Sequence, residues 1–283
     1  MSVILGAATQ QNLLSLQDIN TNLTTTQNHL STGLKVANAV DNAVAFFQAD
    51  ALKNRANDLS NRKDQIDQGI SSLTTATQAA QSVVSILQQL QGILTTAKTQ
   101  TATQRTSAQT QFNSLAKQLT VLVNDASYQG LNLVNSTRSS LNLQFSQSST
   151  SKLTIQGINI QTSGLITNGN ATDLASNVVG LAFANVSNNT SAFDNGFNAL
   201  QTAIDKVQSA AQTLGGNVSF LQTRLQFTTQ YGTTLNTGSG KLILADVNEE
   251  SANLVTLQTR QQLALQALSI ATQSEQAVLK LFR

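Results

Sequence analysis

The chain has 283 residues, of which 40% are hydrophobic and only 11% charged, with one histidine and no cysteine, proline or tryptophan. Without cysteine there is no disulfide or cysteine zinc site, and one histidine leaves a Ser-His-Asp triad unsupported. A net charge of +2 without a basic patch gives no argument for nucleic-acid binding, and no run of 18 apolar residues could span a membrane.

The first predicted element is an amphipathic helix from about Gln11 to Leu34. Leu16, Leu23 and Leu30 lie seven residues apart, which indicates a heptad seam along one face. Gly33 is suited to end this helix. The lone His29 has no ligand partner in the sequence, so we interpret it as a surface or interface imidazole.

Two further helices are predicted after a connector at residues 35–40, with Asp41 as the N-cap of the next helix. The first of the two covers residues 42–99, about 85 Å at 1.5 Å per residue, with apolar residues seven apart at Ile66, Leu73, Ala80, Leu87 and Leu94. The second carries its stripe on Phe112, Leu115, Leu119 and Leu122. Short linkers and sustained heptads favour an antiparallel bundle.

The apolar period then changes to two, which indicates a β-hairpin. Leu141, Leu143 and Phe145 alternate before a polar turn, and Leu153 and Ile155 alternate after it. A change of phase at Gly157 predicts a bulge.

A fourth helix begins at Phe193 and alternates apolar steps of three and four up to Thr228. Its stripe crosses Gly215-Gly216 without a break. Residues 232–240, which contain three glycines, are predicted to link this helix to the last one.

The last predicted helix occupies residues 245–283, opened by a capping box of Asp246 and Glu249. Its seam includes Leu254, Leu257 and Leu268, is widened by Leu265 and Leu279, and ends near Phe282. Ordering each residue costs about 1–2 kcal/mol, whereas a large apolar side chain returns about 1.5–3 kcal/mol only when fully buried. This helix therefore needs a partner surface, and the N-terminal helix is complementary to it.

No constellation for catalysis or cofactor binding is found in the sequence. The glycine clusters Gly215-Gly216 and Gly238-Ser239-Gly240 resemble neither a P-loop nor a dinucleotide-binding fingerprint. The sequence also contains no HExxH motif. Helix capping explains the adjacent carboxylates Glu249 and Glu250 better than acid–base chemistry does. We therefore expect no enzyme activity, no cofactor and no metal site.

Two stretches of sequence resemble the terminal signatures of bacterial flagellins. Residues 31–47, Ser-Thr-Gly-Leu-Lys-Val-Ala-Asn-Ala-Val-Asp-Asn-Ala-Val-Ala-Phe-Phe, are similar to the N-terminal signature. The C-terminal signature is matched by Ala245-Asp246, Glu250-Ser251-Ala252, residues 262–271 and the closing Leu281-Phe282-Arg283, which resembles short alphaproteobacterial flagellins. The resemblance covers about residues 1–160 and 193–283. It departs at Asn42 and Val44–Ala45, where many flagellins have a second Asp and a Gly.

The resemblance implies a mainly α fold: a long antiparallel coiled-coil-like helical bundle with a β-hairpin and a small surface insert, and with the N- and C-terminal helices paired. It also implies three domains. Residues 1–40 and 241–283 would form an inner domain of terminal helices, and residues 41–161 and 193–240 a rod-like bundle with the hairpin. Residues 162–192 would be a small variable surface insert.

The function that the resemblance implies is that of a structural subunit of the bacterial flagellar filament, which polymerises through its terminal helices into a propeller for motility. Expected partners are further copies of the chain, other flagellins, the flagellar export apparatus and a chaperone, and hook-associated and cap proteins. The expected location is extracellular, after secretion, with no nucleic acid or membrane partner. The expected polymerisation interface is Leu16, Leu23, Leu30, Leu254, Leu257, Leu265, Leu268, Leu279 and Phe282.

Two alternatives stay open at this point. A hook–filament junction protein has similar termini, although the close match at residues 262–271 favours flagellin. A secreted coiled-coil adhesin or secretion-tip protein would explain the heptads but not both terminal signatures. Growth of long filaments from seeds would distinguish a flagellin from either.

Overall fold

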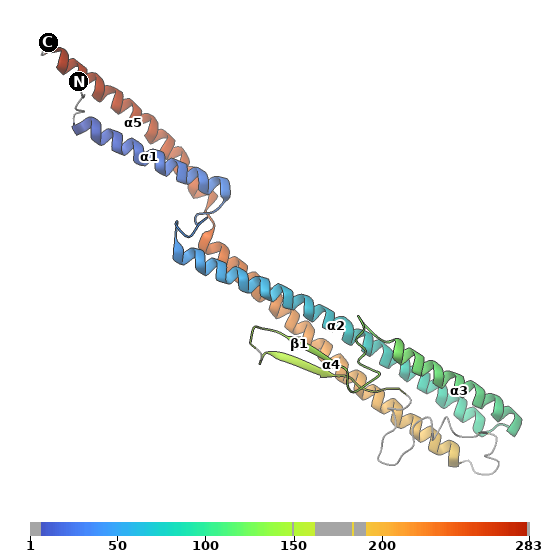
Figure 1. Ribbon diagram of the computed structural model, residues 1–283. Coiled ribbons are helices and arrows are strands. Elements are labelled where there is room, and N and C mark those ends of the chain that lie inside the picture. Colours follow the sequence, from blue (N-terminus) through green and yellow to red (C-terminus); the bar gives the residue numbers. More distant parts are fainter. Residues whose placement is uncertain (1–6, 149, 162–182, 184–190, 282–283) are drawn as a thin grey trace. The chain divides into compact units, whose positions relative to one another are not determined.

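The computed structural model describes residues 7–148, 150–161, 183 and 191–281, and the structural statements below concern those residues. They form five helices and one two-stranded sheet (Figure 1). The chain divides into a terminal unit, residues 1–56 and 233–283, and a central unit, residues 57–232. The predicted mainly α fold with a hairpin is confirmed. The elements are α1 (Ala7–Thr32), α2 (Ala43–Lys98), α3 (Ala102–Asp125), β1 (Ser140–Gln144), β2 (Lys152–Gln156), α4 (Ser191–Ile243) and α5 (Val247–Leu281).

The central unit is built around α2, α3 and α4, and its core contains the heptad positions predicted from the sequence. Ile66, Leu73 and Leu87 on α2 are completely buried. Phe183, from the expected insert, packs edge-on against Phe112 of α3, with 5.7 Å between ring centroids. The rest of residues 162–190 lies outside the described residues.

The hairpin pairs β1 with β2 in antiparallel register, with Leu141 opposite Ile155 and Leu143 opposite Leu153. Leu143 is buried against α2 at Gly69, where a Cβ atom would lie 2.6 Å from the Leu143 Cδ1. The hairpin is therefore seated at a position where α2 has no side chain. The predicted bulge at Gly157 is wrong, because Gly157 follows the end of β2.

Gly157 has a different role, because the Ser136 carbonyl oxygen lies where its side chain would be. An added Cβ atom would be 2.4 Å from that oxygen. The Gly157 N–H donates to the Ser139 carbonyl at 2.7 Å. The backbone thus passes too close to the preceding loop for any larger residue.

Helix α4 continues to Ile243, so the predicted linker at residues 232–240 is wrong. In this segment Leu235 is buried, and the buried Ser239 Oγ donates to the Ala49 carbonyl of α2 at 2.9 Å. An added Cβ at Gly238 would lie 3.6 Å from Leu52, in ordinary contact distance. Packing against the first turns of α2 therefore maintains the helix despite the low helix propensity of glycine.

The start of α2 also differs from the prediction, because Asn42 and not Asp41 is its N-cap. The Asn42 Oδ1 accepts from the Ala45 N–H at 3.0 Å, whereas the Asp41 carboxylate accepts from the N–H groups of Ala37 and Asn38 at 2.9 Å. Both residues are good caps. The Asp41 carboxylate binds the backbone of the preceding turn, so the side-chain amide of Asn42 caps the helix.

Candidate assembly surface

In the terminal unit, α1 and α5 lie side by side and antiparallel (Figure 1). The Gln261 Nε2 donates to the Asn20 Oδ1 across the pair at 2.6 Å. Threonine also enters the seam: Thr26 is only 7% exposed. The predicted seam leucines that are half-buried here are Leu16, Leu23, Leu30, Leu254, Leu257 and Leu268.

Of the three other predicted interface residues, only Leu265 has a described side chain. Leu265 is 51% exposed. The side chain of Leu279 and all of Phe282 lie outside the described residues. The seam therefore joins the two terminal helices of one chain, and Leu265 is left largely exposed beside it.

A second apolar surface is present on the same helix pair. Val255, Leu263 and Ile270 are spaced by eight and seven residues, which brings them to one side of α5. That side is roughly opposite the seam formed by Leu257 and Leu268. We call Val255, Leu263 and Ile270, each 60–63% exposed, the outer apolar face. The spacing of these residues is visible in the sequence, whereas their exposure depends on how α1 and α5 pair.

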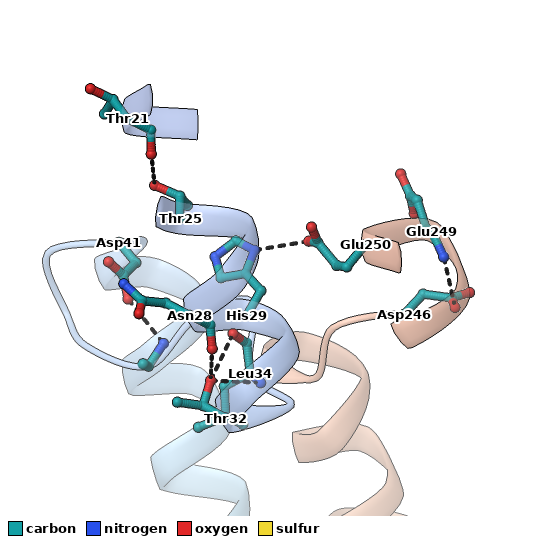
Figure 2. A network of polar contacts seen from close by, with 11 residues as sticks. Thr21, Thr25, Asn28, His29, Thr32, Leu34, Asp41, Asp246, Glu249 and Glu250 are labelled. Carbon is teal, nitrogen blue, oxygen red and sulfur yellow. Dashed lines mark hydrogen bonds and ion pairs between the residues drawn. The ribbon is translucent and has the colours of Figure 1, made fainter. Parts of the chain in front are cut away.

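A network of polar contacts joins the C-terminal end of α1 to the N-terminal end of α5 (Figure 2). The His29 Nδ1 lies 2.8 Å from the Glu250 Oε1, which links α1 to α5. The Asp246 Oδ1 accepts from the N–H groups of Asn248 at 2.9 Å and Glu249 at 3.4 Å, so Asp246 caps α5 as predicted. The interpretation of His29 as an interface imidazole is confirmed.

The connection that follows α1 and the one that precedes α5 are joined by backbone hydrogen bonds. The Ile243 carbonyl accepts from Lys35 at 2.7 Å, and Ala245 donates to the Gly33 carbonyl at 3.0 Å. Gly33 has a φ of +69°, a conformation that ends α1 and that residues with a Cβ rarely adopt. The C-terminal end of α1 and the N-terminal end of α5 are thereby held together.

The interactions that this surface can offer a partner are burial of apolar side chains and hydrogen bonds. No group of three potential metal-ligating side chains gathers anywhere in the described part of the chain. Of the helices described, none is both long and apolar enough to cross a membrane.

Paired terminal helices with exposed apolar side chains are typical of one class of protein, helical subunits that associate with further subunits. Comparison with known proteins identifies the family. Residues 6–139 match the bacterial flagellin N-terminal helical region, and residues 197–282 match the bacterial flagellin C-terminal helical region.

Similar proteins agree with these two matches. A flagellin of Brucella melitensis is 29% identical over 100% of this chain and 99% of its own length. Flagellin FljO of Caulobacter vibrioides is 31% identical over 96% of both chains. A structure described as a flagellar hook-associated protein of Vibrio parahaemolyticus has a TM-score of 0.63 and covers 72% of this chain and 100% of its own, but is only 15% identical, so the likeness concerns the fold.

The chain belongs to the bacterial flagellins and is a structural subunit of the flagellar filament. Flagellins polymerise with themselves and with other flagellins, and the filament that they form is extracellular and serves motility. The hook-associated alternative is the weaker one, because it is supported by fold likeness and not by sequence.

Proposed function

We propose that this flagellin polymerises through its terminal unit, with different tasks for the two apolar surfaces of the α1–α5 pair. The seam, which includes Leu257 and Leu268, joins the ends within each subunit. The outer apolar face then packs against neighbouring copies in the filament. Leu279 and Phe282, which belong to the same predicted interface, extend that contact toward the C-terminus.

The observation that carries this proposal is the concentration of exposed large apolar side chains on one helix pair. Val255 and Leu263 are each 63% exposed, and Ile270 is 60% exposed. Burying such a side chain fully gives about 1.5–3 kcal/mol, so each has about 1–2 kcal/mol still to gain from a neighbouring subunit. Large apolar side chains gathered on an exposed surface mark an interaction site in soluble proteins.

The proposal includes a division of the subunit that follows its predicted domains. Residues 1–40 and 241–283 form the inner layer of the filament, residues 41–161 and 193–240 the surrounding bundle, and residues 162–192 an outer insert. Contacts between different surfaces of successive copies generate an open helical polymer when they do not close into a ring.

The proposed route to the filament involves four further kinds of partner. The chain leaves the cell through the flagellar export apparatus with the help of a chaperone, and it assembles between hook-associated proteins and a cap. Support for these partners comes from membership of the flagellin family. We also propose that the subunit has no catalytic activity, because its sequence contains no catalytic constellation.

Seeded growth of the purified chain tests the proposed function. Short filament fragments are mixed with monomer, and elongation is followed by light scattering and electron microscopy. A flagellin extends the seeds into micrometre filaments. A hook–filament junction protein binds to seed ends without continuing growth, and an adhesin or tip protein does not extend them. Either of the last two outcomes contradicts the proposal.

A further inference from the structure

The only histidine of the sequence lies where α1 ends and α5 begins. His29 is in the last turn of α1, and Glu250 is in the first turn of α5. Their side chains point toward each other, with 2.8 Å between the His29 Nδ1 and the Glu250 Oε1 (Figure 2). Because the backbone is joined at the same place, between Gly33 and Ala245, this side-chain contact reinforces the end of the helix pair.

The surroundings of the His29–Glu250 pair favour its charged form. The side chains of His29 and Glu250 are only 21% and 14% exposed, so water screens their attraction incompletely. A helix carries partial negative charge at its C-terminus, where His29 lies, and partial positive charge at its N-terminus, where Glu250 lies. A hydrogen bond between ionised partners is also about twice as strong as one between neutral groups. The pair is therefore strongest when His29 is protonated and Glu250 is ionised.

The other charged groups near the pair do not cancel this attraction. Neither His29 nor Glu250 forms another ion pair among the described residues. Residues 19–49 and 240–259 include the segments that meet at the pair, and their other charged side chains are all exposed: Lys35, Asp41, Lys241, Asp246 and Glu249. Three of these are acidic and two are basic, so together they do not oppose a proton on His29.

The composition of the chain makes this pair its main side-chain sensor of pH near neutrality. The sequence contains one histidine and no cysteine. Carboxyl side chains ordinarily titrate near pH 4, and lysine and tyrosine near or above pH 10. A histidine ordinarily changes its charge near pH 6.5, and besides it only an α-amino group titrates between about pH 6 and 8.

We propose that the His29–Glu250 pair makes the stability of the α1–α5 helix pair, and with it filament assembly, dependent on pH. At about pH 6 a protonated His29 binds an ionised Glu250. As the pH rises to about 8, His29 loses its proton, and a weaker hydrogen bond to a neutral imidazole is left. Assembly is therefore favoured at the lower pH. This inference rests on the proposed function, in which the terminal unit mediates polymerisation.

Seeded elongation of the full chain at two pH values tests the inference. The same seeds are mixed with monomer at about pH 6 and at about pH 8, at equal ionic strength, and the critical concentration for elongation is measured. For the wild-type chain we expect a critical concentration about fivefold higher at the higher pH, as when a hydrogen bond to a charged group is replaced by a neutral one. Equal values, or a lower value at the higher pH, would overturn the proposal.

Two substitutions of the histidine fix the charge of this position. His29→Arg keeps a positive charge at both pH values, so its critical concentration should be low at both. His29→Gln has no charge to lose, so its critical concentration should be high at both. The matched control is Gln27→Arg, which adds the same charge at an exposed position of α1 and should keep the pH dependence of the wild type. An undiminished pH dependence in His29→Arg would assign the effect to another group and refute the proposal.

A double-mutant cycle with Glu250→Gln tests whether His29 acts through this carboxylate. At about pH 6, Glu250→Gln and His29→Gln should each raise the critical concentration about fivefold, and combining them should add little to either alone. At about pH 8 the coupling between the two positions should largely disappear. A purely structural role of His29 predicts the same coupling at both pH values, and that result would contradict the proposal.

These measurements separate the inference from the proposed function. Failure of the wild-type chain to extend seeds at either pH would contradict polymerisation itself. Growth of the wild-type chain with the same critical concentration at both pH values would contradict only the role of the His29–Glu250 pair. Thermal unfolding followed by circular dichroism identifies a variant that has lost its fold. The comparison of wild type with His29→Arg then decides the question.

Discussion

The central and terminal units bury their apolar residues in different ways. In the central unit, side chains such as Phe112, Leu119 and Leu200 are completely covered within one chain. In the terminal unit the seam leucines are only half-buried, and most of the exposed large apolar side chains among the described residues belong to it. One unit has a core closed within the chain, whereas the other leaves apolar surface exposed, which by our proposal further copies cover.

This difference follows from the number of helices available to cover each face. In the central unit α2 is packed by α3, α4 and the hairpin, so a residue such as Leu73 is enclosed from all sides. Among the described residues, helix α5 is paired with α1, and Val255, Leu263 and Ile270 on its other side are exposed. Since ordering costs about 1–2 kcal/mol per residue, a half-buried seam is poorly suited to maintain two long helices alone.

The largest expected effect comes from placing charge in the seam. Leu257→Asp combined with Leu268→Asp should abolish filament growth, because burying each unpaired carboxylate costs several kcal/mol. The central unit should unfold at an unchanged temperature, as measured by circular dichroism. Gln212→Asp, an exposed position of α4, is the control for added charge. Normal filaments from the double variant would show that the seam is not needed for assembly.

The second expected effect concerns exchange of backbone amides. Residues 250–280 should exchange rapidly with solvent in the monomer, and slowly in the filament where the outer apolar face is covered. Residues 66–94 of α2 should be protected in both states. Mass spectrometry of monomer and filament measures this contrast. Strong protection of residues 250–280 in the monomer would show that the helix pair is stable alone.

Shortening one side chain in each unit should distinguish the closed core of the central unit from the half-buried seam of the terminal unit in the monomer. Phe112→Ala removes a completely buried ring and should lower the free energy of unfolding by about 3–5 kcal/mol. Leu23→Ala, in the seam, should leave the main thermal transition of the monomer unchanged and should slow filament growth. Equal losses of monomer stability in the two variants would contradict the distinction.

The smallest expected effect compares two glycines of α2. Gly92→Ala should stabilise the monomer by up to about 1 kcal/mol, because nothing lies within 4 Å of the added Cβ and alanine favours the helix. Gly69→Ala gains the same propensity but pushes against Leu143, and overpacking costs about 1–3 kcal/mol. Chemical denaturation should therefore give a higher midpoint for Gly92→Ala than for Gly69→Ala. A reversed order would mean that the hairpin is loosely seated.

The sequence by itself determined the features that depend on local periodicity. The heptads at Ile66, Leu73 and Leu87 indicated the buried side of α2, and the alternation around Leu143 indicated the hairpin. The leucines of the two ends indicated that α1 and α5 form a pair. Such patterns are readable because a helix repeats every 3.6 residues and a strand every two, whatever lies beside them.

Only the tertiary structure decided the features that depend on residues far apart in the chain. The helix through residues 232–243 is supported by the bond from Ser239 to Ala49, a partner that no local pattern identifies. Likewise, the sequence places Arg224 on α4 but cannot tell that Phe145 of the hairpin lies over it. These outcomes are set by packing between distant segments, because contacts of about 1 kcal/mol or more outweigh the small propensity differences by which single residues favour helix or loop.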